Sequence, residues 1–383
     1  MKASGAVGDG VREVWRMAGG GAGRGGLFAG EFADVAAGTS PLQARGTVKA
    51  PVVFDLRGRC FVADFAGSLS AFLPDGQRAW EASLPGAVSA APAVTADGAI
   101  VVVGTLTGSV LALTTEAGRK LWQRELPTKT DPRILSDLLA MPDDAGVVAS
   151  SWGGRFWRLD ARTGEPQASW DAGIYPQSGA AADRRGNLFL LRAVWEKGVE
   201  IVRVTASGEE QVWHCEPEGS RQARRMVVTA SPVIDEAAAH LYAVFNRDRD
   251  AVLCGFDLRD GARLWRRELP APVMATPGLP ADGGVVVADL AGQVRAFDAS
   301  GNPRWSYDAG TDYLLAGPVT GTRGGVAVWI GDPLGRVHRI DADGRGAVCF
   351  EGGRSCETRA SFGPDGRLYV PTTDGLIAAL SVV

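Results

Sequence analysis

The chain has 383 residues, of which 45% are hydrophobic, so it has ample material for a large buried core. Forty lysine and arginine residues nearly balance 44 aspartate and glutamate residues. The net charge of −4 excludes a global positive field that would draw the protein to nucleic acid or to an anionic membrane.

Sequence features that report on the cellular compartment point to the cytoplasm. Residues 1–17 contain no apolar run of signal-peptide length, and no later segment approaches the roughly 18 uninterrupted apolar residues of a membrane span. The five cysteines show no Cys-x-x-Cys spacing, as expected of reduced thiols that fill core space. We therefore expect a soluble, monomeric, cytoplasmic protein that contacts no membrane.

The first predicted element is a strand at residues 11–17. Its sequence REVWR, at residues 12–16, matches ARLWR at 262–266 and QRAWE at 77–81. Residues 18–44 follow as a glycine-rich crossover that includes Gly21, Gly23 and Gly26 in a G-x-G-x-x-G spacing. Because no helix or βαβ unit follows these glycines, we expect a flexible connection and no nucleotide site.

From residue 45 the chain repeats one unit with a period in the forties, which is typical of β-propeller blades. Each unit holds four short strands with alternating apolar residues, as in SVLALTT, joined by turns such as PDGQ and EAGR. The units cover residues 45–84, 86–126, 129–172, 174–218, 223–269, 271–309 and 311–352. Their last strands carry Trp80, Trp122, Trp170, Trp213, Trp265 and Trp305, with Phe350 in the seventh.

The remaining residues, 354–383, supply three strands and lack the last one. The strand at 11–17 would complete this blade and close the ring, because pairing removes an exposed sheet edge. We therefore predict an all-β fold: one domain over residues 1–383 that forms an eight-bladed propeller of four-stranded antiparallel blades. A seven-bladed ring stays an alternative, because the third and fourth units are the least regular.

These units resemble the PQQ-like β-propeller family. The resemblance rests on the segments Ser89–Trp122 and Met274–Trp305 and on the opening VWRMAGGGAGRGG. It implies that each repeated tryptophan packs against the next blade. The family holds quinoprotein dehydrogenases and cofactor-free members, among them an outer-membrane assembly lipoprotein that binds proteins. The dehydrogenases carry an adjacent-cysteine disulfide and a calcium site. This chain has no adjacent cysteines, so we expect neither a quinone cofactor nor a metal, and the missing export signal and lipobox argue against the outer-membrane role.

The inner strands can be compared column by column. Two positions before the repeated proline most units carry a small residue, but three carry Lys49, Asp137 and Arg359. The first and last blades are neighbours in the ring, so Lys49 and Arg359 could hold an anionic group with Asp137 across the channel. The alternative is that these charges fill a wet channel and pair with one another.

Other candidates lie on the same variable face, formed by the connections between blades and by the turns between second and third strands. Exposed aromatic rings beside arginines and acids at a cavity mouth are typical of binding sites, although the rings could also simply cover their own loops. The candidates are Arg133, Trp152, Tyr175, Trp195, Arg225, Asp312, Tyr313, Asp332 and Glu357.

We therefore expect a propeller without a redox cofactor that binds a protein partner, or a small anionic or aromatic ligand, at the channel mouth. The alternative is a cofactor-independent enzyme of the lyase, cyclase or isomerase type. In it, Asp137 or Glu357 would act as general acid or base, and Lys49 with Arg359 would stabilise developing negative charge.

Overall fold

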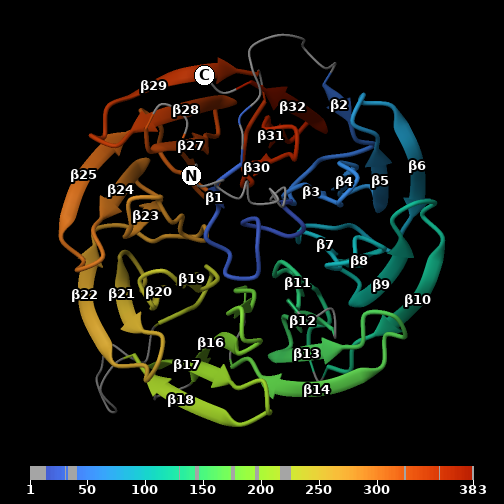
Figure 1. Cartoon of the computed structure of the whole chain (residues 1–383), viewed down its shortest axis with the longest axis horizontal. Coiled ribbons are helices and arrows are strands. Elements are labelled where there is room, and N and C mark those ends of the chain that lie inside the picture. The colour runs from blue at the N-terminus through green and yellow to red at the C-terminus, as the bar shows by residue number, and fades with distance from the viewer. Residues whose placement is uncertain are drawn as a thin grey trace, which may run out of the picture.

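Eight small sheets surround a common axis in the computed structural model of the chain (Figure 1). The structure describes residues 14–30, 32, 41–128, 130–142, 146–173, 177–194, 198–215, 226–322, 325–352 and 354–381. Over these residues the secondary structure is all β. The predicted eight-bladed propeller is confirmed, and the seven-bladed alternative is wrong.

The first four blades follow one another around the ring, each with its first strand nearest the axis (Figure 1). Their strands are β3 (Val53–Phe54), β4 (Cys60–Ala63), β5 (Ser68–Phe72) and β6 (Arg78–Ser83); β7 (Ala93–Val94), β8 (Ile100–Gly104), β9 (Ser109–Thr114) and β10 (Lys120–Glu125); β11 (Leu139–Ala140), β12 (Val147–Ser151), β13 (Arg155–Leu159) and β14 (Pro166–Asp171); and β15 (Ala181–Ala182), β16 (Leu188–Val194), β17 (Gly198–Val204) and β18 (Glu210–His214).

The last four blades depart from this plan in two places. In the sixth, a bridge between Gly278 and Val286 replaces the innermost strand, and in the seventh an extra strand, β1 (Leu27–Phe28), pairs in parallel with β26. The strands are β19 (Val233–Asp235), β20 (His240–Asn246), β21 (Ala251–Asp257) and β22 (Arg263–Leu269); β23 (Val285–Ala288), β24 (Gln293–Phe297) and β25 (Pro303–Asp308); β26 (Val319–Gly321), β27 (Ala327–Gly331), β28 (Arg336–Asp341) and β29 (Gly346–Glu351); and β30 (Ser361–Phe362), β31 (Leu368–Pro371), β32 (Leu376–Leu380) and β2 (Leu42–Gln43).

The repeated tryptophans join neighbouring blades. Trp80 donates its indole N–H to the carbonyl of Thr115 in the next blade at 3.0 Å, and Trp122 makes the same contact with Ala161 at 3.0 Å. The ring of Trp80 covers Gly118, where a Cβ atom would lie 2.5 Å from the indole. The glycine of the EAGR turn therefore permits both the positive φ of 63° and the close approach of the neighbouring tryptophan.

The ring is closed by a strand from the N-terminal part of the chain, but not by the residues predicted. The outer strand of the last blade is β2, in which Leu42 pairs with Ile377 and Gln43 with Leu376. Residues 11–13 lie outside the described residues, and residues 14–17 are not part of this sheet. The assignment of the closing strand to residues 11–17 is therefore wrong.

Trp15 explains the error. Its local sequence matches the outer-strand tryptophans, yet its side chain is fully buried at the inner end of the last blade, with its ring centroid 5.7 Å from that of Phe362. The ring of Phe28 stacks on the ring of Phe362, with 4.6 Å between their centroids. Trp15 therefore packs in an apolar cluster inside the ring, whereas the tryptophans that it resembles in sequence lie in outer strands.

Residues 14–30, here called the plug, lie inside the ring (Figure 1). Plug carbonyls accept hydrogen bonds of 2.7–2.9 Å from the inner strands or bridges of six blades. The donor–acceptor pairs are Phe54–Trp15, Val94–Arg16, Ala182–Ala22, Ile234–Gly23, Leu279–Gly25 and Thr320–Gly26. The side chain of Arg24 reaches the third blade, and the Trp15 and Phe28 rings reach the last. The expected flexible crossover over residues 18–44 is therefore wrong for residues 18–30, which are fixed by contacts with the whole ring.

Candidate functional site

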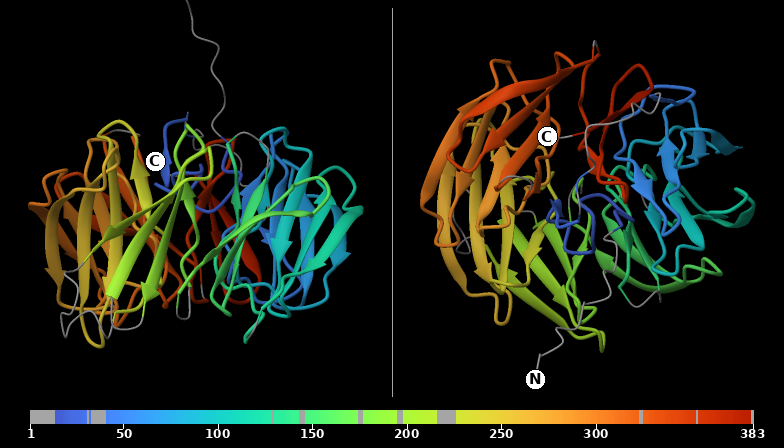
Figure 2. Two further views of the ribbon diagram at one scale, coloured as in Figure 1. Left: turned by 90° about the horizontal axis from the view of Figure 1, so that it is seen from below. Right: turned by 45° about the horizontal axis from the view of Figure 1, so that its top comes forward.

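The strands run between two faces of a disc, as the side view in Figure 2 shows. One face carries the connections between blades and the turns between second and third strands; we call it the mouth face. The other, which we call the hairpin face, carries the remaining turns within the blades. The plug lies inside the channel, with one cavity on its mouth side and another on its hairpin side.

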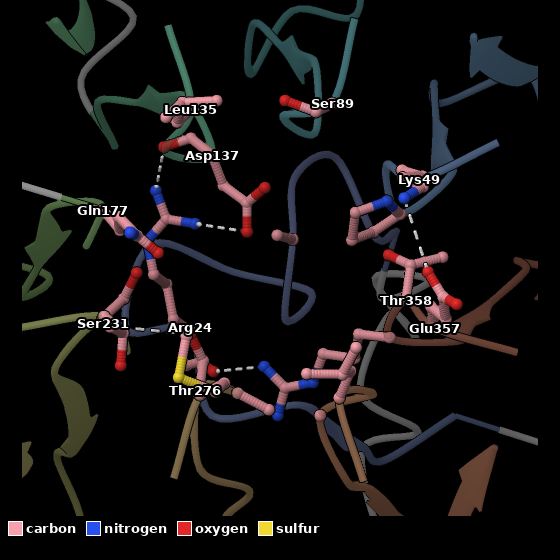
Figure 3. Close-up of a pocket in the computed structure, with 18 of the residues that line it drawn as sticks. Arg24, Lys49, Ser89, Leu135, Asp137, Gln177, Ser231, Thr276, Glu357 and Thr358 are labelled. Carbon is pink, nitrogen blue, oxygen red and sulfur yellow. Dashed lines mark hydrogen bonds and ion pairs between the residues drawn. The ribbon is translucent and has the colours of Figure 1, made fainter. Parts of the chain in front are cut away.

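This mouth cavity has a volume of about 530 Å³. The segments that lead into the inner strands of all eight blades line it, and the plug contributes Ala18 and Arg24 (Figure 3). Of the residues predicted from the sequence, it brings together Lys49, Asp137, Trp152, Glu357 and Arg359.

Arg24 is the cavity residue that sequence reasoning missed. Its side chain is 1% exposed and donates hydrogen bonds to the carbonyls of Ala180, Asp137 and Leu138, the last two at 2.8 and 3.1 Å. Its Nη1 atom lies 3.9 Å from Oδ2 of Asp137. A single arginine inside the run GGGAGRGG was the available signal, because a long charged side chain is out of place among residues chosen for close backbone packing.

Arg359 holds the plug in place. Nε donates to the carbonyl of Pro318 at 3.0 Å, Nη1 to that of Arg24 at 3.0 Å, and Nη2 to those of Pro277 and Pro318 at 2.9 and 2.7 Å. Burial lowers the pKa of Arg359 to about 9, with Asp137 opposing this shift and Arg24 adding to it. The guanidinium thus joins blades six and seven to the plug.

Lys49 pairs with Glu357 on the other side of the cavity (Figure 3). The Nζ–Oε2 distance is 3.6 Å, and Nζ also lies 5.5 Å from the ring centroid of Phe65. The hydroxyl of Ser355 donates to Oε1 of Glu357 at 3.2 Å. Asp137 accepts a hydrogen bond from the backbone N–H of Ala91 at 2.7 Å. Two of the three charges that replace small residues in the inner strands are therefore in loose ion pairs, Lys49 with Glu357 and Asp137 with Arg24.

Arg133 and Trp152 form part of the rim. The guanidinium of Arg133 lies 5.2 Å from the ring centroid of Trp152 and makes a two-pronged ion pair with Asp131. Hydrogen bonds with Arg133 lower the pKa of the Asp131 carboxyl. Trp152 reaches the cavity, whereas Arg133 does not line it.

Three further predicted residues, Asp312, Tyr313 and Asp332, do not line the cavity. Asp312 and Tyr313 are exposed on the mouth face. Asp332 is fully buried in a turn, where it accepts hydrogen bonds from Arg336 at 2.6 Å and contacts His338 at 3.0 Å. Burial acts to raise the pKa of Asp332, but the bonds with His338 and Arg336 lower it overall. Tyr175, Trp195 and Arg225 lie outside the described residues.

Two further findings concern metals and membranes. Within the described residues, no group of three or more His, Cys, Asp or Glu side chains could hold a metal ion. The same part of the chain contains no helix that is long and apolar enough to cross a membrane.

Comparison with known proteins then gives the family. The model of the PQQ-like repeat family described as "Outer membrane protein assembly factor BamB" matches residues 8–212 and 197–348. The chain belongs to this family. The resemblance seen in the repeated units is thereby confirmed.

Relatives in the family carry the same description. The outer membrane protein assembly factor BamB of Burkholderia pseudomallei is 26% identical over 74% of this chain, and the match spans 60% of that relative's length. The factor of the same name from Xanthomonas campestris pv. campestris is 30% identical over 87% of this chain and 81% of its own length. The crystal structure of BamB from Moraxella catarrhalis covers 90% of this chain and 99% of its own, with a TM-score of 0.72 at 19% identity, and shows the shared fold.

These relatives correct the expected compartment. The sequence features led us to predict a cytoplasmic protein and to set aside an outer-membrane role. Both curated relatives are assembly factors of outer membrane proteins, so the cytoplasmic assignment is wrong. The error arose because the prediction relied on the absence of a recognisable signal near the first residue.

Proposed function

We propose that this protein is a protein-binding scaffold in outer membrane protein assembly, and that it contacts its partner with the mouth face. Membership of the family and the names of the two relatives support a role in this assembly process. We choose the mouth face because a set of apolar side chains, which we call the apolar crown, surrounds the mouth cavity. It consists of Phe65, Trp152, Val227, Tyr313 and Leu334.

The crown has the character of a binding surface. Phe65 is 38% exposed and Leu334 60% exposed, and each lies in a turn between the second and third strands of its blade. Large exposed apolar side chains rimmed by polar groups are favourable sites for protein contacts, because their burial removes apolar surface from water. The enzymatic alternative gains less support, since Asp137 and Glu357 are engaged by Arg24 and Lys49, and Arg359 by backbone carbonyls.

In-cell photocrosslinking tests this proposal. A photoreactive amino acid replaces Phe65 or Leu334 on the mouth face, and, as matched controls, Leu73 or Leu56 on the hairpin face. Leu73 is 38% and Leu56 57% exposed, so the first matches Phe65 in exposure and the second nearly matches Leu334. We expect the two mouth positions to capture the same component of the outer membrane assembly machinery, identified by mass spectrometry. Capture of that component only from Leu73 and Leu56, or from none of the four positions, would refute the assignment of the mouth face.

A further inference from the structure

We propose that the floor of the mouth cavity is an anion subsite, in which a carboxylate of the partner accepts a hydrogen bond from Nη1 of Arg24. The identity of the carboxylate's owner rests on the proposed function, whereas the subsite itself rests on the geometry of the cavity. Figure 3 shows the residues involved, with Arg24 beside Asp137 on one side and Lys49 beside Glu357 on the other.

The cavity holds more positive than negative side chains. Among the described residues, three cations, Arg24, Lys49 and Arg359, line it together with two acids, Asp137 and Glu357, so one positive charge is in excess there. Two of the three cations are buried, with Arg24 at 1% and Arg359 at 6% exposure. A buried cation without a full counter-charge is costly, because the loss of its hydration is only partly offset.

Arg24 also offers an unused donor. Its Nη1 atom is buried and makes no hydrogen bond with any described residue, although Nε and Nη2 bond to carbonyls. The 3.9 Å separation from Asp137 is too long for a hydrogen bond. The Oγ atom of Ser89, which lines the same cavity, is likewise buried without a partner among the described residues.

These two features favour an oxyanion over a neutral ligand. An anion would supply the missing counter-charge and an acceptor for Nη1 together, and hydrogen bonds from a guanidinium to an anionic oxygen are among the strongest in proteins. Because the cavity opens inside the apolar crown, a docked partner could place a terminal or side-chain carboxylate in it. A free phosphate has the same chemistry and is a second possible source.

Calorimetric titration of the purified full chain with defined probes tests the subsite. The probes are acetyl-Gly-Gly-Ala with a free carboxylate, the same peptide with a C-terminal amide, and inorganic phosphate. We expect the free-carboxylate peptide to bind and the amide not to bind. If phosphate binds and the peptide does not, the subsite stands and its ligand is a free anion.

The Asp137→Asn variant should change anion affinity in a direction that simple loss of structure would not produce. The asparagine oxygen can keep the hydrogen bond from Ala91 N–H, while the competing negative charge disappears. We expect anion binding to tighten roughly tenfold, as for removal of one like charge near a binding group. Asp75→Asn is the matched control, because Asp75 is exposed in a hairpin and likewise accepts a backbone hydrogen bond, from Gln77 at 2.9 Å.

Three results would overturn the subsite: detectable and equal binding of the free and amidated peptides, no binding of any probe, or no tightening in Asp137→Asn. Tightening of the same size in Asp75→Asn would also overturn it, because the effect would then follow net charge. The crosslinking experiment does not depend on a carboxylate. Its success alongside failure of the titration would retain the proposed function and remove only the subsite.

Discussion

Gly26 is the residue at which the plug depends most clearly on the absence of a side chain. Its φ is 67°, and a Cβ atom would lie 2.2 Å from Nη2 of Arg359. We expect Gly26→Ala to lower the free energy of unfolding by about 2 kcal/mol or more, because the left-handed backbone and the displaced guanidinium both add cost. Urea denaturation measures the change.

Gly21 provides the matched control, since a Cβ atom there would meet nothing within 4 Å. Gly21→Ala should change stability by no more than about 0.5 kcal/mol. Similar losses in the two variants would contradict the view that Arg359 and Gly26 fix the plug.

Comparison of the repeated units position by position located the cavity, but it did not identify the partners of the charges there. Lys49, Asp137 and Arg359 stand out because they replace small residues in the repeated inner strand, and all three line the cavity. The partners of Arg359 are main-chain carbonyls, including one at Arg24 that is 335 positions away. Carbonyls are present at every residue and leave no pattern in the sequence, so the structural role of Arg359 could not be read from it.

At the scale of elements, the plug is the part of the fold that repeat analysis could not place. Blade strands are specified by alternating residues and turn glycines that occur in every unit. The plug occurs once, and its strand content is only β1, so neither periodicity nor repetition describes it. The two-residue β2 is equally short, and Trp15 offered a stronger but misleading match to an outer strand.

Limited proteolysis tests whether Trp15 anchors the plug. Trypsin cleaves after arginine only where the chain is accessible, and Arg24 is buried in the docked plug. We expect the native protein to resist cleavage after Arg24. In Trp15→Ala the loss of contact with Phe362 should cost about 3–5 kcal/mol and expose that bond to trypsin.

Trp15→Phe is the control for this experiment, because it keeps an aromatic ring against Phe362. It should retain most of the protection from trypsin. Rapid cleavage after Arg24 in the wild-type protein would show that the plug is not docked as described.

At the scale of the whole molecule, the plug changes how the repeats share stability. Stacked repeats contact only their neighbours and can open separately. Here β2 closes the ring and the plug touches every blade, so opening one blade disturbs contacts with the segment that holds the others. We therefore expect the described ring to unfold as one cooperative unit.

Thiol labelling during urea unfolding measures this cooperativity, because buried cysteines are spread around the ring. Cys60 and Cys356 belong to the apolar cluster that contains Trp15, and Cys215 and Cys254 to another. Burial raises the pKa of Cys356 to about 12 and so suppresses its thiolate. In the native protein only the exposed Cys349 should react, and the four buried thiols should become reactive in one transition.

In Trp15→Ala, Cys60 and Cys356 should react at lower urea than Cys215 and Cys254. Separate transitions for the two pairs in the wild-type protein would mean that the plug does not unite the blades.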